Sequence, residues 1–97
     1  MLTREEILNY LKEYKSLKKD EYHIKKLGIF GSYARNEARE NNDIDIVVDF
    51  EEPDLFYQIG IMQDLREKFN TKVDVIALWK HINPRLLTRI QKDAIYV

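Results

Sequence analysis

The residues of this sequence with the clearest chemical potential are three aspartates in two strand-like segments. Asp43 and Asp45 stand two positions apart, so in a strand their side chains would leave the same face, about 6.6 Å apart at the backbone. Carboxylates about 5 Å apart repel by about 3 kcal/mol at an effective dielectric constant of about 20, and a divalent cation would remove this repulsion. Asp74 stands between two valines in the later segment. Because Mg²⁺ prefers oxygen ligands, we interpret all three as candidate metal ligands.

A Gly-Ser pair upstream of these aspartates has the features of a phosphate site. Ten residues separate Ser32 from Asp43. Gly31 would let the chain turn sharply after a strand and let a ligand approach the backbone. Ser32 would begin a helix whose free N–H groups attract anions. A phosphate bound at Gly31 and Ser32 would complement a metal ion bound at the aspartates.

The first half of the chain predicts two helices and two strands that position these residues. Thr3 and Glu6 form a capping box, and a helical apolar stripe follows it: Ile7, Tyr10, Leu11, Tyr14 and Leu17. A short buried strand is predicted over 27–30 and a helix from Ser32 to about Glu40, ended by two asparagines. The next strand, over 43–49, would place Ile44, Ile46 and Val48 on one face, opposite Asp43, Asp45, Val47 and Asp49.

The second half continues the alternation. Pro53 and Asp54 open a longer helix that ends at Asn70, with this apolar stripe: Leu55, Ile59, Met62, Leu65 and Phe69. A strand over 72–78 would separate Val73, Val75 and Ala77 from Asp74, Ile76 and Leu78. Asn83 and Pro84 begin a fourth helix. The order of elements predicts an α/β fold with helices around a small mixed sheet of three strands.

Length and composition narrow the class of protein. We expect a single domain over residues 1–97, since no Pro/Gly/Ser-rich stretch divides the chain. Sixteen Lys and Arg against seventeen Asp and Glu give a net charge of −1, so we expect no direct binding of nucleic acid. The chain has no cysteine, which excludes disulfides and thiolate metal sites. The charged N-terminal segment and the lack of a long apolar run predict a cytoplasmic protein without a membrane span.

Together, Gly31-Ser32, the ten-residue spacer, Asp43-Ile44-Asp45 and the later Asp74 resemble the motif of the DNA polymerase β-like nucleotidyltransferase superfamily. The chain is most similar to its minimal, single-domain members, the MNT antitoxins that are paired with HEPN-domain toxins. The resemblance spans residues 27–78, and the flanking helices extend it to nearly the whole sequence. Asn36 and Asn42 stand where glycine and serine are common. Asparagine can adopt the left-handed conformation and can bond a turn, so we expect the nucleotidyltransferase fold to be kept.

The resemblance implies a transferase that uses ATP and two Mg²⁺ ions. Asp43 and Asp45 would be catalytic metal ligands, and Asp74 would complete the second metal site and help to remove the acceptor's proton. Gly31 and Ser32 would bind the β- and γ-phosphates of the nucleotide. Two arginines of the short helix, Arg35 and Arg39, would add positive charge near the triphosphate. A solvated helix face paired with glutamate is an equally good interpretation of these two arginines.

The resemblance also implies a partner. Minimal members of this superfamily transfer AMP from ATP to a tyrosine of the HEPN toxin and so silence a ribonuclease. This chain would then be a protein adenylyltransferase and an antitoxin in a hetero-oligomer with such a toxin. Two alternatives stay open. The first is a noncatalytic antitoxin that acts by binding alone, which the three retained acids disfavour. The second is a small-molecule nucleotidyltransferase, which usually carries an additional domain for the acceptor.

Overall fold

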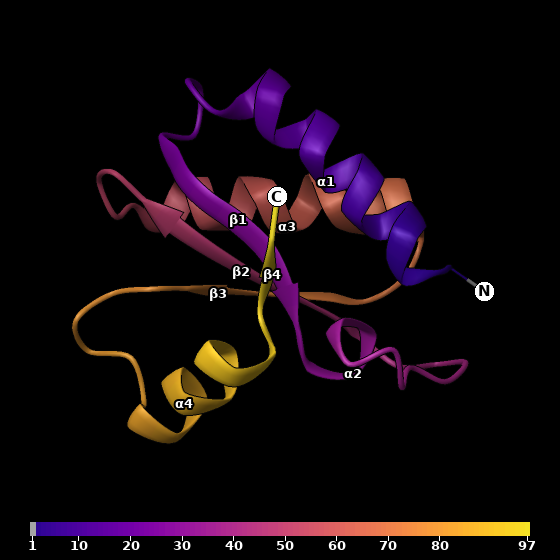
Figure 1. Cartoon of the computed structure of the whole chain (residues 1–97). Coiled ribbons are helices and arrows are strands. Elements are labelled where there is room, and N and C mark those ends of the chain that lie inside the picture. Colours follow the sequence, from indigo (N-terminus) through magenta and orange to yellow (C-terminus); the bar gives the residue numbers. More distant parts are fainter. Residues whose placement is uncertain (1) are drawn as a thin grey trace.

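The computed structural model describes residues 2–97, which form one sheet with helices on both of its sides (Figure 1). The elements in chain order are α1 (Arg4–Lys18), β1 (Ile24–Phe30), α2 (Gly31–Ala34), β2 (Ile44–Phe50), α3 (Leu55–Phe69), β3 (Val73–Ala77), α4 (Pro84–Asp93) and β4 (Ile95–Tyr96). The strand order across the sheet is β3-β2-β1-β4. β1 is antiparallel to β2 and β4, whereas β2 and β3 are parallel. The predicted α/β class and mixed sheet are confirmed.

The number of strands differs from the prediction. The C-terminal strand β4, which the sequence did not reveal, pairs two residues with Gly28 and Ile29 of β1, so the described residues form four strands instead of three. A side chain at position 28 would overlap the backbone carbonyl of Ile95, so glycine permits this close approach. Two residues are too few to show an alternating pattern, which is why β4 leaves no signal in the sequence.

Alternation along the strands divides the apolar side chains between the two faces of the sheet. On one face, which we call the α1/α3 face, both long helices cover the predicted apolar set of β2: Ile44, Ile46 and Val48. The opposite face, which we call the α4 face, carries Val47 of β2 and Phe30 of β1, and Ile90 of α4 packs against them. Figure 1 shows α1 and α3 on one side of the strands and α4 on the other. The predicted division of β2 and β3 between two faces is confirmed.

The start of α1, the end of α3 and the start of α4 lie close to where their capping residues predicted them. Thr3 and Glu6 form the expected capping box at the start of α1. Asn70 ends α3 in the left-handed conformation, with φ of 51°. The side-chain oxygen of Asn83 accepts hydrogen bonds from the first N–H groups of α4. No helix within residues 2–97 combines the length and the apolar character needed to cross a membrane.

The apolar stripes of α1 and α3 required correction. In α3 the buried residues are Ile61, Leu65 and Phe69, whereas Leu55 is 68% exposed and Ile59 36% exposed. At 100° per residue, this stripe is rotated by about 60° from the predicted one. The rotation brings the side-chain amide of Gln58 to the edge of the sheet, where it donates a hydrogen bond to the carbonyl of Val75.

In α1 the buried stripe consists of Ile7, Leu11 and Tyr14. Leu17 is 74% exposed, because it lies roughly 90° from the centre of that stripe. Its place in the predicted stripe was wrong.

The predicted helix from Ser32 to about Glu40 is much shorter in the structure. α2 is a single turn that ends at Ala34. Asn36 and Asn41 both have positive φ, at 59° and 75°, and these left-handed residues turn the chain away from a helical path. The side-chain oxygen of Asn42 accepts a hydrogen bond from the N–H of Arg39, so the expected role of Asn42 in bonding this turn is confirmed.

Candidate active site

Two of the three predicted acids lie side by side on the α4 face. Asp45 of β2 and Asp74 of β3 are direct partners in the parallel register of these strands. Adjacent strands are about 4.8 Å apart, so both carboxylates leave the sheet as neighbours. The residue on the other side of Asp45 is Phe30, the last residue of β1. The pairing places the acids where β1 ends and where β2 and β3 begin.

The surroundings of Asp45 disfavour its charged form. Burial raises the pKa of the Asp45 carboxyl, and the negative charges of Asp74 and Asp43 raise it further. The positive charges of Arg89 and Arg35 partly oppose these effects. Asp45 therefore lies among two acids and two arginines, in a place where a cation or a proton would relieve the repulsion.

Asp43 lies outside the predicted strand, and it forms an ion pair that the sequence did not predict. It precedes β2, which begins at Ile44, so it lies just outside the strand that the sequence assigned to it. Its carboxylate forms an ion pair with Lys72, with 3.5 Å between Oδ2 and Nζ. The backbone explains the pairing, because the N–H of Ile44 donates a hydrogen bond to the carbonyl of Lys72. Asp43 is nonetheless close enough to Asp45 to affect the pKa of that carboxyl.

The acidic residues fit a bound Mg²⁺ ion in their chemistry. No three acidic or histidine side chains within residues 2–97 form a ready-made cage for a metal. Mg²⁺ does not usually require such a cage, since it keeps several waters and binds one or two carboxylates together with phosphate oxygens of the substrate. The neighbouring carboxylates of Asp45 and Asp74 supply this type of donor. Burial is the main cause of the raised pKa of Asp45, and the repulsion that adds to it is the part that a cation would remove.

Gly31 lies directly against Asp45, one member of the acidic pair. Its φ of 74° lies in the left-handed region, and a Cβ at this position would overlap the side-chain carboxylate of Asp45. Gly31 thus allows the chain to leave β1 sharply while Asp45 stays close to its backbone. Ser32 follows in the single turn of α2, which is too short to contribute a substantial helix dipole. Any phosphate binding here therefore depends on local N–H groups and not on a long helix.

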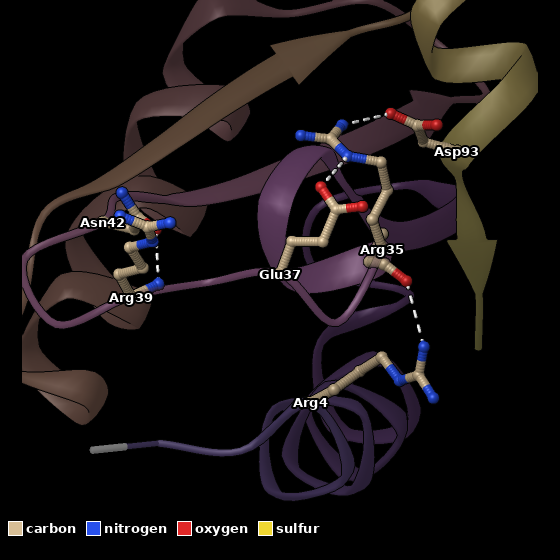
Figure 2. A network of polar contacts seen from close by, with 7 residues as sticks. Arg4, Arg35, Glu37, Arg39, Asn42 and Asp93 are labelled. Atoms are coloured by element: carbon tan, nitrogen blue, oxygen red, sulfur yellow. Dashed lines mark hydrogen bonds and ion pairs between the residues drawn. The ribbon is translucent and has the colours of Figure 1, made fainter.

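Arg35 is held by two carboxylates (Figure 2). Its guanidinium contacts Glu37, at 3.1 Å, and Asp93 at the end of α4, at 2.6 Å. These hydrogen bonds, with Asp93 making the larger contribution, raise the pKa of Arg35. The pairing with glutamate that the sequence left open is present, and a phosphate would have to compete with both acids. Arg39 lies beyond the end of α2, so the expected pair of arginines on one helix is not formed.

The sequence did not single out Arg89, which lies in α4. Together with Asp45 and Asp74, Arg89 lines a pocket of about 350 Å³ at the β3 edge of the sheet, where Met62 of α3 also contributes to the lining. One pattern in the sequence could have indicated it: Arg85 and Arg89 stand four residues apart, each followed by an apolar residue of α4 that packs toward the sheet. Without knowledge of which face α4 covers, that pattern predicts only a helix with a charged edge.

Comparisons with known proteins assign the fold and the family. The family described as polymerase beta, nucleotidyltransferase matches residues 5–97. The protein adenylyltransferase MntA of Thermococcus cleftensis is 34% identical over 98 residues, which cover all of this chain and 98% of that protein.

Solved structures with the same fold include two toxin–antitoxin complexes. One is a toxin–antitoxin complex with AMP-PNP, with a TM-score of 0.73 and 24% identity over 92% of this chain and 72% of the other. The second is a tri-AMPylated HEPN toxin of Shewanella oneidensis in complex with its MNT antitoxin, with a TM-score of 0.62 and 22% identity over 90% of this chain and 69% of the other. The predicted nucleotidyltransferase fold is confirmed, and the chain belongs to the polymerase β nucleotidyltransferase family of enzymes.

Proposed function

We propose that this protein transfers AMP from ATP to a tyrosine hydroxyl of a HEPN-domain toxin, with Mg²⁺, and thereby acts as the antitoxin of that protein. The observation that carries the proposal is the register pair of Asp45 and Asp74, with Gly31 in contact with Asp45, in a chain of this family. Support for the acceptor comes from the protein adenylyltransferase MntA and from the complex of an AMPylated HEPN toxin with its antitoxin. Support for the nucleotide comes from the complex with AMP-PNP.

The transfer is a displacement at the α-phosphorus of ATP. The tyrosine oxygen forms a bond to this phosphorus, the bond from the α-phosphorus to the bridging oxygen breaks, and pyrophosphate leaves with the electron pair. Asp43 and Asp45 would hold Mg²⁺, with Asp74 as a further ligand or as the base that accepts the tyrosine proton. Bound Mg²⁺ supplies positive charge that stabilises the attacking and leaving oxygens.

The other residues of the site position the nucleotide. Gly31 has no side chain between the backbone and an incoming phosphate, and the N–H groups of Gly31 and Ser32 would donate to the β- and γ-phosphates. Asp74 is half-buried in an edge strand, so its carboxylate can be reached by an acceptor that arrives on another protein. The acceptor tyrosine would therefore approach from the open side of the α4 face.

The test is a labelling experiment. The purified protein is incubated with Mg²⁺, ATP labelled at the α-phosphate and a HEPN-domain protein from the same genome. We expect label on the HEPN protein, lost by at least about 100-fold when Asp43→Asn and Asp45→Asn are combined. Asp49→Asn is the matched control, since Asp49 lies on the same strand and face, at the far end from Asp74.

Three outcomes would contradict the proposal. Label that survives in the double variant would remove the acids from the reaction. Tight binding of the HEPN protein without label would indicate a noncatalytic antitoxin. Label on a small molecule, with none on the protein, would indicate a small-molecule nucleotidyltransferase.

A further inference from the structure

We propose that Arg89 of α4 is a substrate-positioning residue that binds the polyphosphate of ATP; this inference rests on the proposed function. Arg89 lies in the wall of the pocket that also contains Asp45 and Asp74. The volume of this pocket, about 350 Å³, lies in the range of about 300–1,000 Å³ typical of small-molecule sites. Its remaining lining is largely apolar: Phe30, Met62, Val75, Ile76 and Leu86.

Packing on each side of Arg89 fixes its backbone position in α4, while its side chain is exposed. Ile90, the next residue, is 1% exposed and packs against the α4 face. One turn before Arg89, Leu86 packs on the same cluster. One turn after it, the side chain of Asp93, only 10% exposed, holds α4 to Arg35. The helix therefore presents Arg89 to the pocket without depending on a flexible loop.

Within the described residues, the guanidinium of Arg89 faces this pocket without a hydrogen-bonding or ion-pair partner. Within residues 2–97, no hydrogen bond or ion pair engages its guanidinium. Arg35, by contrast, is already bound by Glu37 and Asp93. Arg89 acts on Asp45 through its charge, yet it does not form an ion pair with that carboxylate. A space therefore separates positive charge on α4 from negative charge on the sheet.

A metal-bound polyphosphate has the charge distribution that fits this space. Its oxygens can bind a cation held at Asp45 and Asp74 and, on their other side, a guanidinium. Arginine suits this role because its planar fork donates two parallel hydrogen bonds to a phosphate group. A nucleoside monophosphate offers fewer oxygens and less charge, so the contribution of Arg89 should depend on the length of the phosphate chain.

The experiment measures nucleotide binding by titration calorimetry, with Mg²⁺ present and no partner protein. The variants are Arg89→Ala, Arg89→Lys and the matched control Arg85→Ala, which removes an exposed arginine one turn earlier in the same helix. We expect Arg89→Ala to weaken ATP binding by about tenfold or more and AMP binding by no more than about twofold. Arg89→Lys should restore part of the ATP affinity, and Arg85→Ala should leave it unchanged.

The outcomes separate this inference from the proposed function. The role of Arg89 would be overturned if Arg89→Ala bound ATP as tightly as the parent protein does. It would also be overturned if Arg89→Ala and Arg85→Ala lost the same amount of ATP affinity. An equal loss for AMP and ATP would also overturn the inference, because Arg89 would then act through the fold or through the α-phosphate that both nucleotides share, and not through the polyphosphate. If the parent protein binds ATP but labels no partner, the proposed transfer is wrong while the binding data still decide the role of Arg89. If the parent protein does not bind ATP at all, both are wrong.

Discussion

The two faces of the sheet differ in what covers them. Two helices of 15 residues each, α1 and α3, cover the α1/α3 face, and they bury a continuous apolar core against it. The α4 face has one helix of 10 residues and a smaller apolar cluster around Ile90. The acids Asp45 and Asp74 emerge from this second face, beside that cluster.

This difference separates the source of stability from the site of the proposed chemistry. Complete burial of apolar side chains gives the α1/α3 face most of its favourable free energy. Two neighbouring carboxylates would be costly there, because an unpaired charge in an apolar core has no water to solvate it. The α4 face leaves the end of the sheet half-exposed, so charged groups and a charged substrate can be accommodated.

Leucine truncation on the two faces gives the largest expected difference. Leu65 of α3 is fully buried on the α1/α3 face, whereas Leu86 of α4 is partly exposed. Leu65→Ala should lower the free energy of unfolding by about 2–5 kcal/mol, because it removes a buried side chain and leaves a cavity. Leu86→Ala should lower it by less than about 2 kcal/mol, since water already reaches part of that side chain. Urea unfolding followed by circular dichroism measures both values, and equal losses would contradict the division of roles.

Helix capping provides a second comparison, with a smaller effect. Thr3 caps α1, and Asn83 caps α4. Thr3→Ala and Asn83→Ala should each lower the free energy of unfolding by about 0.5–2 kcal/mol. Only Asn83→Ala should also weaken ATP binding, because α4 carries Arg89 into the pocket.

Calorimetry at a temperature where both capping variants are folded decides this second comparison. If Thr3→Ala reduces ATP affinity as much as Asn83→Ala, the site depends on overall stability and the two faces are not independent. As a control, thermal unfolding of the same samples shows whether the two variants are folded to the same extent at the temperature of the binding measurement.

The sequence predicted the features that local patterns determine. Alternating residues in β2 and β3 identified which side chains of each strand share a face. That Asp45 and Asp74 lie side by side follows from the parallel pairing of the two strands in the structure. Gly31 was identified because a sharp turn after a strand requires glycine, and its φ of 74° agrees. The caps at Thr3 and Asn83 were evident because capping depends on residues three or fewer positions apart.

The features that the sequence missed depend on contacts between distant segments. The pairing of β4 with Gly28 joins two segments that are far apart in the sequence and that no local pattern links. The extent of α2 was overestimated because helix propensity after Ser32 competed with two left-handed asparagines. Arg89 escaped notice because its proximity to Asp45 depends on which face α4 covers. The catalytic and ligand roles of Asp43, Asp45 and Asp74 remain proposals that the labelling experiment addresses.

The smallest expected effect concerns the acids themselves, in the absence of metal. Burial, together with Asp74 and Asp43, raises the pKa of Asp45 above its ordinary value of 3.8. The folded protein therefore binds a proton at a higher pH than the unfolded chain does. From this site alone, stability is highest below pH 3.8 and falls as the pH rises through the folded pKa. Asp45→Asn removes the unfavourable charge, so its stabilising effect should be present at neutral pH and absent below pH 3.8.

Thermal unfolding in EDTA at several pH values measures this effect as the difference between Asp45→Asn and the parent protein. We expect a rise in Tm of up to about 4 °C at pH 7, kept small because Arg89 and Arg35 partly offset the repulsion. Asp49→Asn is again the control, and taking differences cancels the titration of the other carboxylates. A lower Tm for Asp45→Asn at pH 7 would contradict this prediction, and so would a rise in Tm that persists unchanged at pH 3. Either result would mean that the charge of Asp45 does not destabilise the metal-free protein. In that case repulsion between the acids would not favour the binding of a cation on the α4 face. The two faces of the sheet would then differ only in how tightly their apolar side chains are packed.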